Sequence, residues 1–107
     1  TYTHDFALNV KALIKNELWG LYNLVSTGQT SRFEVAAELL NILKLQNEIE
    51  LHPVKSDFFK DEFFAERPSS ERLINKKLEL RELNLMRPWQ VSLSEYIKKS
   101  YKNFLND

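Results

Sequence analysis

The sequence predicts an α+β fold, in the form of a small helix-rich domain with two or three short strands. Apolar residues recur every three or four positions in several stretches, which is typical of helices with one buried face. Two short runs of strand-forming residues lie between the expected helices. The chain has 107 residues, enough for one core but not for two. We therefore expect residues 1–107 to form a single domain.

The first helix is expected to begin at Thr3, because threonine is a good N-cap residue. Asp5 follows in the first turn, where a carboxylate favours the positive end of the helix dipole. Gly20 can end this helix in the left-handed conformation. Its apolar stripe would contain Phe6, Val10, Leu13, Ile14 and Leu18.

The second helix is expected from about Ser31 to Leu45. Ser31 and Glu34 stand three residues apart, the spacing of a capping box in which each side chain bonds the other residue's backbone N–H. One face of this helix is apolar and would contain Phe33, Ala36, Ala37, Leu40 and Leu43.

Strands are expected at residues 21–26 and 49–54, although Pro53 must lie at the edge or the end of the second. Two strands that are joined through a helix are consistent with a parallel pair. A two-stranded ribbon is marginal by itself. We therefore expect the domain to dock against a larger sheet.

The C-terminal part is expected to hold three further elements. Residues 57–64 contain four phenylalanines, at 58, 59, 63 and 64, which suit a short helical turn packed on the core. Asn75 could cap a short helix that carries Leu78 and Leu83. Pro88 suits the first turn of the last helix. The buried stripe of that helix would contain Trp89, Leu93, Tyr96, Ile97, Tyr101 and Phe104.

Composition excludes several classes of function. Lysine plus arginine and aspartate plus glutamate are equal at 15 each, so no excess positive charge is available for nucleic acid. The one basic cluster (Lys98, Lys99 and Lys102) is typical of a solvated helix face. No apolar run reaches the length of a membrane span. Cysteine is absent, which excludes disulfides and fits a reducing compartment, so we expect a cytoplasmic protein.

The search for catalytic and metal-binding motifs is mostly negative. Gly20 and Gly28 are the only glycines and cannot form a phosphate-binding loop or a dinucleotide turn. Without cysteines, His4 and His52 make a zinc site improbable, and we expect no metal.

Three acidic positions invite an acid–base interpretation. His4 precedes Asp5, but the pair lies in a helix start, where a structural role is the simpler interpretation. Glu34 and Glu38 lie one helical turn apart, but capping already explains Glu34. We therefore assign no catalytic residue.

Arg67 is the one candidate binding residue. It precedes Pro68, which disfavours the helical conformation and predicts an extended loop over residues 66–70. A guanidinium held in such a loop can bind a phosphate or a carboxylate with two parallel hydrogen bonds. The alternative is that Arg67 only shapes the loop or pairs with Glu66 or Glu71.

Several stretches together resemble the C-terminal part of dTDP-4-dehydrorhamnose reductases, which are extended short-chain dehydrogenase/reductases. The stretches are "TYTHDFA", "GLYNLVSTGQTSRFEVAAELL", "IELHPVKSDFF", "AERPSSERLINKKL" and "MRPWQVSLSEYI". The matching positions are Tyr2, Thr3, Asp5, Ala7, Gly20, Tyr22, Ser31, Glu34, Ala36, Arg67, Pro68, Leu73, Lys77, Leu78 and Trp89. Departures from the family pattern lie at Arg32, Phe33, Val35, Ser70, Glu71 and Ile74.

The resemblance implies the substrate-binding subdomain of an NADP-dependent Rossmann reductase, in a C-terminal fragment of a longer enzyme. The parent would reduce dTDP-4-dehydro-L-rhamnose to dTDP-L-rhamnose with NADPH. Arg67 would bind the nucleotide-sugar substrate. The fragment itself would bind no cofactor, and its partner would be the Rossmann half of the same chain. The family's Tyr-x-x-x-Lys pair is absent, because no tyrosine here is followed four residues later by lysine.

Two alternatives stay open. The chain could be a free-standing interaction domain, whose four phenylalanines would form a partner surface. It could also belong to a reductase or an epimerase of another nucleotide sugar. A further expectation is that the isolated piece exposes apolar surface or self-associates, because its sheet partner is missing.

Overall fold

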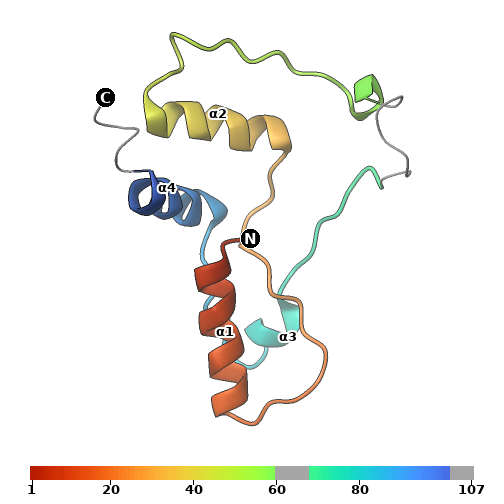
Figure 1. Cartoon of the computed structure of the whole chain (residues 1–107). Helices are drawn as coiled ribbons and strands as arrows, with labels where there is room; N and C mark the ends of the chain where they lie inside the picture. Colours follow the sequence, from red (N-terminus) through yellow and green to blue (C-terminus); the bar gives the residue numbers. More distant parts are fainter. Residues whose placement is uncertain (60–67, 102–107) are drawn as a thin grey trace.

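The computed structural model describes residues 1–59 and 68–101 of the chain. In this part the elements are α1 (Thr3–Lys15), α2 (Arg32–Leu43), the 3-10 helix η1 (Ser56–Phe59), α3 (Lys76–Glu79) and α4 (Trp89–Ser100). α2 lies against α4, whereas α1 lies beside the short α3 (Figure 1).

The chain is less compact than its length predicts. Its radius of gyration is 17.0 Å, whereas about 13 Å is typical of a compact domain of this size. Only four apolar side chains of the described part are buried (Leu13, Leu78, Met86 and Ile97), and four polar ones are buried with them (Asp5, Asn9, Asn75 and Ser92). Such a core is small for a chain of this length.

The capping box of α2 is confirmed. The backbone N–H of Glu34 donates to Oγ of Ser31 at 3.2 Å, and the N–H of Ser31 donates to the Glu34 carboxylate at 2.6 Å. These hydrogen bonds lower the pKa of Glu34, chiefly through the Ser31 backbone N–H. At the other end Lys44 adopts the left-handed conformation, with φ of 59°, and ends the helix.

The first helix differs from the prediction at both ends. Its N-cap residue is Tyr2, and no side chain caps it, because Thr3 already lies in the first turn. The helix ends at Lys15, well before Gly20. Glu17 takes the left-handed conformation with φ of 53°, and the N–H of Leu18 bonds the carbonyl of Leu13 at 3.0 Å. A local turn therefore ends the helix without a glycine.

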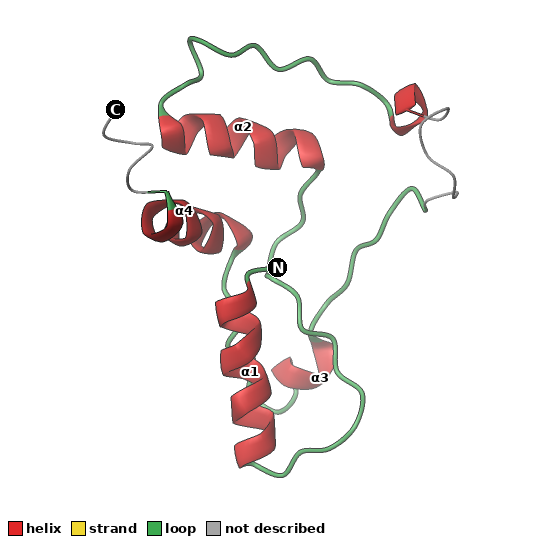
Figure 2. Cartoon of the chain, viewed as in Figure 1, coloured by secondary structure: helices red, strands yellow, loops and turns green. Residues whose placement is uncertain are grey.

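The expected strands at 21–26 and 49–54 are absent, as Figure 2 shows for the described residues. A single parallel bridge joins Thr27 to Pro88. The strand prediction at 21–26 was wrong because a side chain takes the place of a neighbouring strand. The N–H of Val25 donates to Oδ1 of Asn75 at 3.0 Å, and Nδ2 of Asn75 donates back to the Val25 carbonyl at 2.7 Å.

Two C-terminal helices form where they were expected, but α3 ends at Glu79 and does not include Leu83. Asn75 precedes α3, but its side chain does not cap the helix, because it bonds Val25 and Asn84 instead. Pro88 is the N-cap residue of α4. Of that helix's expected stripe, Ile97 is buried, whereas Tyr96 is 40% exposed. Phe104 and Lys102 lie outside the described residues.

The described residues of the phenylalanine-rich turn are helical, as predicted, but they do not pack in the core. Phe58 and Phe59 lie in η1 with their ring centroids 5.0 Å apart in an edge-to-face pair. Phe58 is 69% exposed. Phe63 and Phe64 lie outside the described residues.

Candidate functional site

A buried acidic group at the start of α1 connects this helix to α4. Asp5 is 1% exposed. It accepts a hydrogen bond from Oγ of Ser92 at 2.6 Å and another from Nε of Arg87 at 2.8 Å. The Nη2 atom of Arg87 lies 2.7 Å from the same Asp5 oxygen, without the angle of a hydrogen bond. Each carboxylate oxygen of Asp5 thus accepts a hydrogen bond from another part of the fold.

Arg87 extends this connection to the exposed side of α4. It also donates to Glu95, which in turn accepts from Nζ of Lys99 at 2.6 Å. The two hydrogen bonds, the one from Arg87 first, lower the pKa of Glu95 to about 2. The hydrogen bonds to Glu95 and Asp5 raise the pKa of Arg87. The Arg87 guanidinium is thus paired with two carboxylates and is a poor candidate for binding an anionic ligand.

A second polar contact fixes α1 to the segment before α4. Asn9 is fully buried. Its Nδ2 donates to the carbonyl of Leu83 at 2.7 Å, and its Oδ1 accepts from the N–H of Leu85 at 3.1 Å. The inward side of α1 therefore carries two polar residues, Asp5 and Asn9, and only one apolar residue, Leu13.

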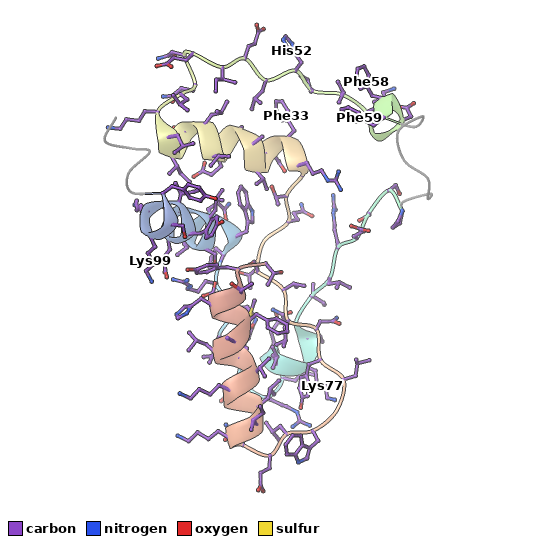
Figure 3. The ribbon with its side chains drawn as sticks, viewed as in Figure 1. Phe33, His52, Phe58, Phe59, Lys77 and Lys99 are labelled. Atoms are coloured by element: carbon purple, nitrogen blue, oxygen red, sulfur yellow. The ribbon has the colours of Figure 1, made fainter. Side chains whose placement is uncertain are left out.

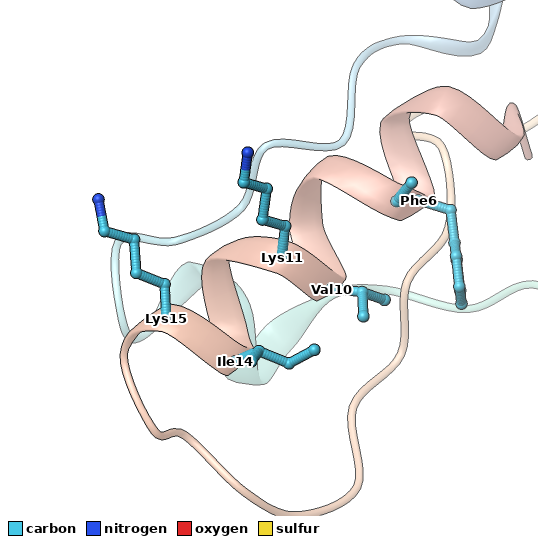
Figure 4. Close-up of a pocket in the computed structure, with 6 residues that line it drawn as sticks. Phe6, Val10, Lys11, Ile14 and Lys15 are labelled. Atoms are coloured by element: carbon cyan, nitrogen blue, oxygen red, sulfur yellow. The ribbon is translucent and has the colours of Figure 1, made fainter.

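The apolar stripe of α1 points away from the rest of the chain. Phe6 is 44% exposed and Ile14 is 55% exposed. With Ala7, Val10, Lys11 and Lys15 they line a shallow apolar depression of about 550 Å³, which we call the outer face of α1 (Figure 4). Of the stripe predicted for this helix, Leu13 is buried, whereas Phe6 and Ile14 are exposed, in line with the expectation that the isolated piece exposes apolar surface. An apolar face of this kind is typical of a surface that contacts another part of a protein.

A second depression, of about 370 Å³, lies between α2 and α4. It is lined by Gln29, Glu34, Ala37, Glu38, Trp89 and Gln90. Gly28 lies against the indole, because a Cβ there would be 3.3 Å from Cδ1 of Trp89. The Trp89 indole N–H is buried and has no hydrogen-bond partner in the described part. Two carboxylates in its lining disfavour a phosphate-bearing ligand here.

The sequence-predicted binding residue, Arg67, lies outside the described residues. Pro68 and Ser69, which follow it, are exposed. Sequence analysis did not identify the cluster that forms around Tyr22. Nζ of Lys77 lies 4.4 Å from the centroid of this ring, and Cζ of Arg81 lies 5.7 Å from it. The sequence shows that Lys77 and Arg81 are four residues apart, but it does not show that both lie next to the ring of Tyr22.

The described residues do not fit a nicotinamide dinucleotide. Gly20 and Gly28 each lie against a side chain from another segment, Lys77 and Trp89, and neither belongs to a glycine-rich turn. In the same part of the chain, no three side chains of the metal-binding types come together. None of the helices described here is long and apolar enough to cross a bilayer.

Comparison with known proteins agrees with the resemblance that the sequence motifs indicated. Residues 1–102 match the family model described as the RmlD substrate binding domain. Searches of curated proteins and of solved structures gave no match. The family match covers nearly the whole chain and includes both the capped helix α2 and the segments around Tyr22, so the chain belongs to the RmlD substrate binding domain family.

Proposed function

We propose that this chain is the nucleotide-sugar-binding portion of a dTDP-4-dehydrorhamnose reductase. The observation that carries the proposal is the family match over residues 1–102. The parent enzyme would reduce dTDP-4-dehydro-L-rhamnose to dTDP-L-rhamnose. NADPH would supply the hydride and would bind the Rossmann half. The chain's own contribution would be to bind the sugar nucleotide and to orient its keto group.

The outer face of α1 supports the presence of a second half. Phe6, Val10 and Ile14 expose an apolar stripe, while the polar residues Asp5 and Asn9 form the helix's internal contacts. A helix with its apolar side outward is stable in a complete protein when another element covers that side. We infer that the Rossmann half of the parent enzyme covers it. In this arrangement the catalytic groups belong to the other half, in agreement with the absence of a Tyr-x-x-x-Lys pair here.

Arg67 is proposed as a substrate-binding residue on the basis of the family resemblance. In the full-length parent, Arg67→Ala should weaken nucleotide-sugar binding by about 1.5–3 kcal/mol, the range of hydrogen bonds to charged groups. Arg67→Lys should restore only part of the loss, because an ammonium does not reproduce the planar guanidinium. The affinity for NADPH should hardly change.

Steady-state kinetics of the parent enzyme test both the reaction and the residue. The proposed function predicts NADPH-dependent reduction of dTDP-4-dehydro-L-rhamnose by the unmodified parent. No turnover of this substrate by a parent that binds NADPH would contradict the assigned reaction. An unchanged KM and kcat for the sugar nucleotide in Arg67→Ala would instead reduce Arg67 to a residue that shapes its loop.

A further inference from the structure

A positively charged site surrounds the ring of Tyr22, in the segment that follows α1. Lys77 and Arg81 approach this ring with their cationic groups 4.4 Å and 5.7 Å from its centroid. Lys77 lies in α3, and Arg81 lies in the turn just after Leu80, the C-cap residue of α3. Figure 3 shows Lys77 beside α3, next to the segment that follows α1.

The two cations have no counter-charge within the described part of the chain. Every ion pair found there involves other residues, and neither Glu79 nor Glu82 forms one. The tyrosine ring attracts each cation, but it carries no net charge. Among the described residues, the site around Tyr22 therefore holds two positive charges that no ion pair neutralises.

The backbone holds one of these cations in place. Gly20 has φ of +130°, and a Cβ at this position would lie 3.0 Å from Nζ of Lys77. The ammonium donates one hydrogen bond to the carbonyl of Leu21 at 3.2 Å. Two of its N–H groups stay available, and the guanidinium of Arg81 makes no hydrogen bond to any described residue. Neighbouring donors with a net positive charge suit the oxygens of a phosphate.

We propose that Tyr22, Lys77 and Arg81 form a binding site for a phosphoanhydride, an anion with at least two negative charges. The inference rests on the proposed function for the identity of the ligand, and it assigns the diphosphate of the sugar nucleotide to this site. The depression between α2 and α4 is unsuitable because Glu34 and Glu38 line it. Arg87 is unsuitable because Asp5 and Glu95 already neutralise it.

The test uses two-dimensional NMR of the isotopically labelled chain, titrated with pyrophosphate and separately with dTDP-L-rhamnose. We expect saturable shifts of the amide signals of Gly20, Leu21, Tyr22 and Lys77. Lys77→Met keeps most of the side-chain volume and removes the charge, and it should raise the dissociation constant of pyrophosphate about tenfold or more. Lys11→Met is the control, because it removes one positive charge from the outer face of α1. It should change the dissociation constant of pyrophosphate by less than about twofold.

The outcomes separate the inference from the proposed function. Absence of saturable shifts with pyrophosphate, or equal shifts in Lys77→Met and the unmodified chain, would overturn the inference. If dTDP-L-rhamnose binds but leaves the Tyr22 signals unchanged, the inference fails and the proposed function stands. If pyrophosphate binds at Tyr22 but dTDP-L-rhamnose does not bind, the anion site stands and the proposed function fails. Arg81→Met carries the same test if Lys77→Met does not fold.

Discussion

Arg87 donates its Nε–H to the buried carboxylate of Asp5 over 2.8 Å, although 82 positions of the sequence separate the two residues. This contact joins the start of α1 to the segment before α4, and the Ser92 hydroxyl completes it from α4 itself. With so few buried apolar side chains, the relative position of α1 and α4 depends on this polar connection to an unusual degree. Stability measurements at Asp5 therefore test the fold directly.

Asp5→Ala should lower the unfolding free energy by about 2 kcal/mol. This is less than the loss expected for a fully buried ion pair, because Arg87 is partly exposed and retains its ion pair with Glu95. The loss arises because Arg87 and Ser92 both lose their acceptor. Urea unfolding followed by circular dichroism measures it. Glu50→Ala is the control, since Glu50 is exposed and should change the unfolding free energy by less than about 0.5 kcal/mol. Equal effects of the two substitutions would contradict the role given to Asp5.

The pH dependence of stability should report on Glu95. Its native pKa is about 2, compared with 4.5 for an unperturbed glutamate, because Arg87 and Lys99 donate to it. A lowered native pKa contributes stability that is fully present above the unfolded pKa and is lost as the pH falls toward the native one. Glu95→Gln should therefore be less stable than the unmodified chain near neutral pH, and the difference should shrink between pH 4.5 and 2.

Unfolding curves of both proteins at several pH values measure this difference. Glu48→Gln is a suitable control, because Glu48 is exposed and has no ion pair among the described residues. A difference between Glu95→Gln and the unmodified chain that stays constant down to pH 2 would show that the ion pairs of Glu95 do not contribute.

Asn75 should be among the most sensitive positions of the chain. It is 3% exposed, and its carboxamide bonds both backbone groups of Val25 as well as Oδ1 of Asn84. Asn75→Ala leaves these groups without partners, which should cost about 2–3 kcal/mol in unfolding free energy. Asn23→Ala removes one exposed hydrogen bond, to the Ile74 carbonyl, and should cost less than about 1 kcal/mol. A similar loss in both variants would show that Val25 finds other partners.

Local features of the fold could be predicted from the sequence, whereas long-range ones could not. The Ser31 and Glu34 capping box needs only four neighbouring residues, and it was predicted with both of its hydrogen bonds. The strand at 21–26 was wrongly predicted because the partner of Val25 is the side chain of a residue far along the chain. Strand-forming residues favour an extended backbone, but a neighbouring strand decides whether a sheet forms.

The side of α1 that the rest of the chain covers could not be predicted from the sequence either. The spacing of Phe6, Val10 and Ile14 predicted one apolar side of a helix, and the structure confirms that they share a side. Periodicity does not determine which side the rest of the chain covers, and here Asp5 and Asn9 occupy the covered side. The Tyr22 site could not be predicted for a similar reason, since it joins two distant segments.

The outer face of α1 should make the chain self-associate when it is isolated. Ile14→Glu should shift the sedimentation profile toward monomer with little loss of stability, because the side chain of Ile14 is 55% exposed. Leu13→Glu is the matched substitution on the opposite side and should unfold the chain, since Leu13 is 8% exposed. A strict monomer over a wide range of concentrations in the unmodified chain would argue against an uncovered apolar surface.

The central claim is that this chain binds a sugar nucleotide and leaves the cofactor to another part of the parent enzyme. Isothermal titration calorimetry of the chain with dTDP-L-rhamnose and with NADPH compares the two ligands directly. The account predicts saturable binding of dTDP-L-rhamnose that weakens with added salt, and no binding of NADPH at the same concentrations. Binding of NADPH in preference to dTDP-L-rhamnose, or no binding of the sugar nucleotide by the folded chain, would contradict it.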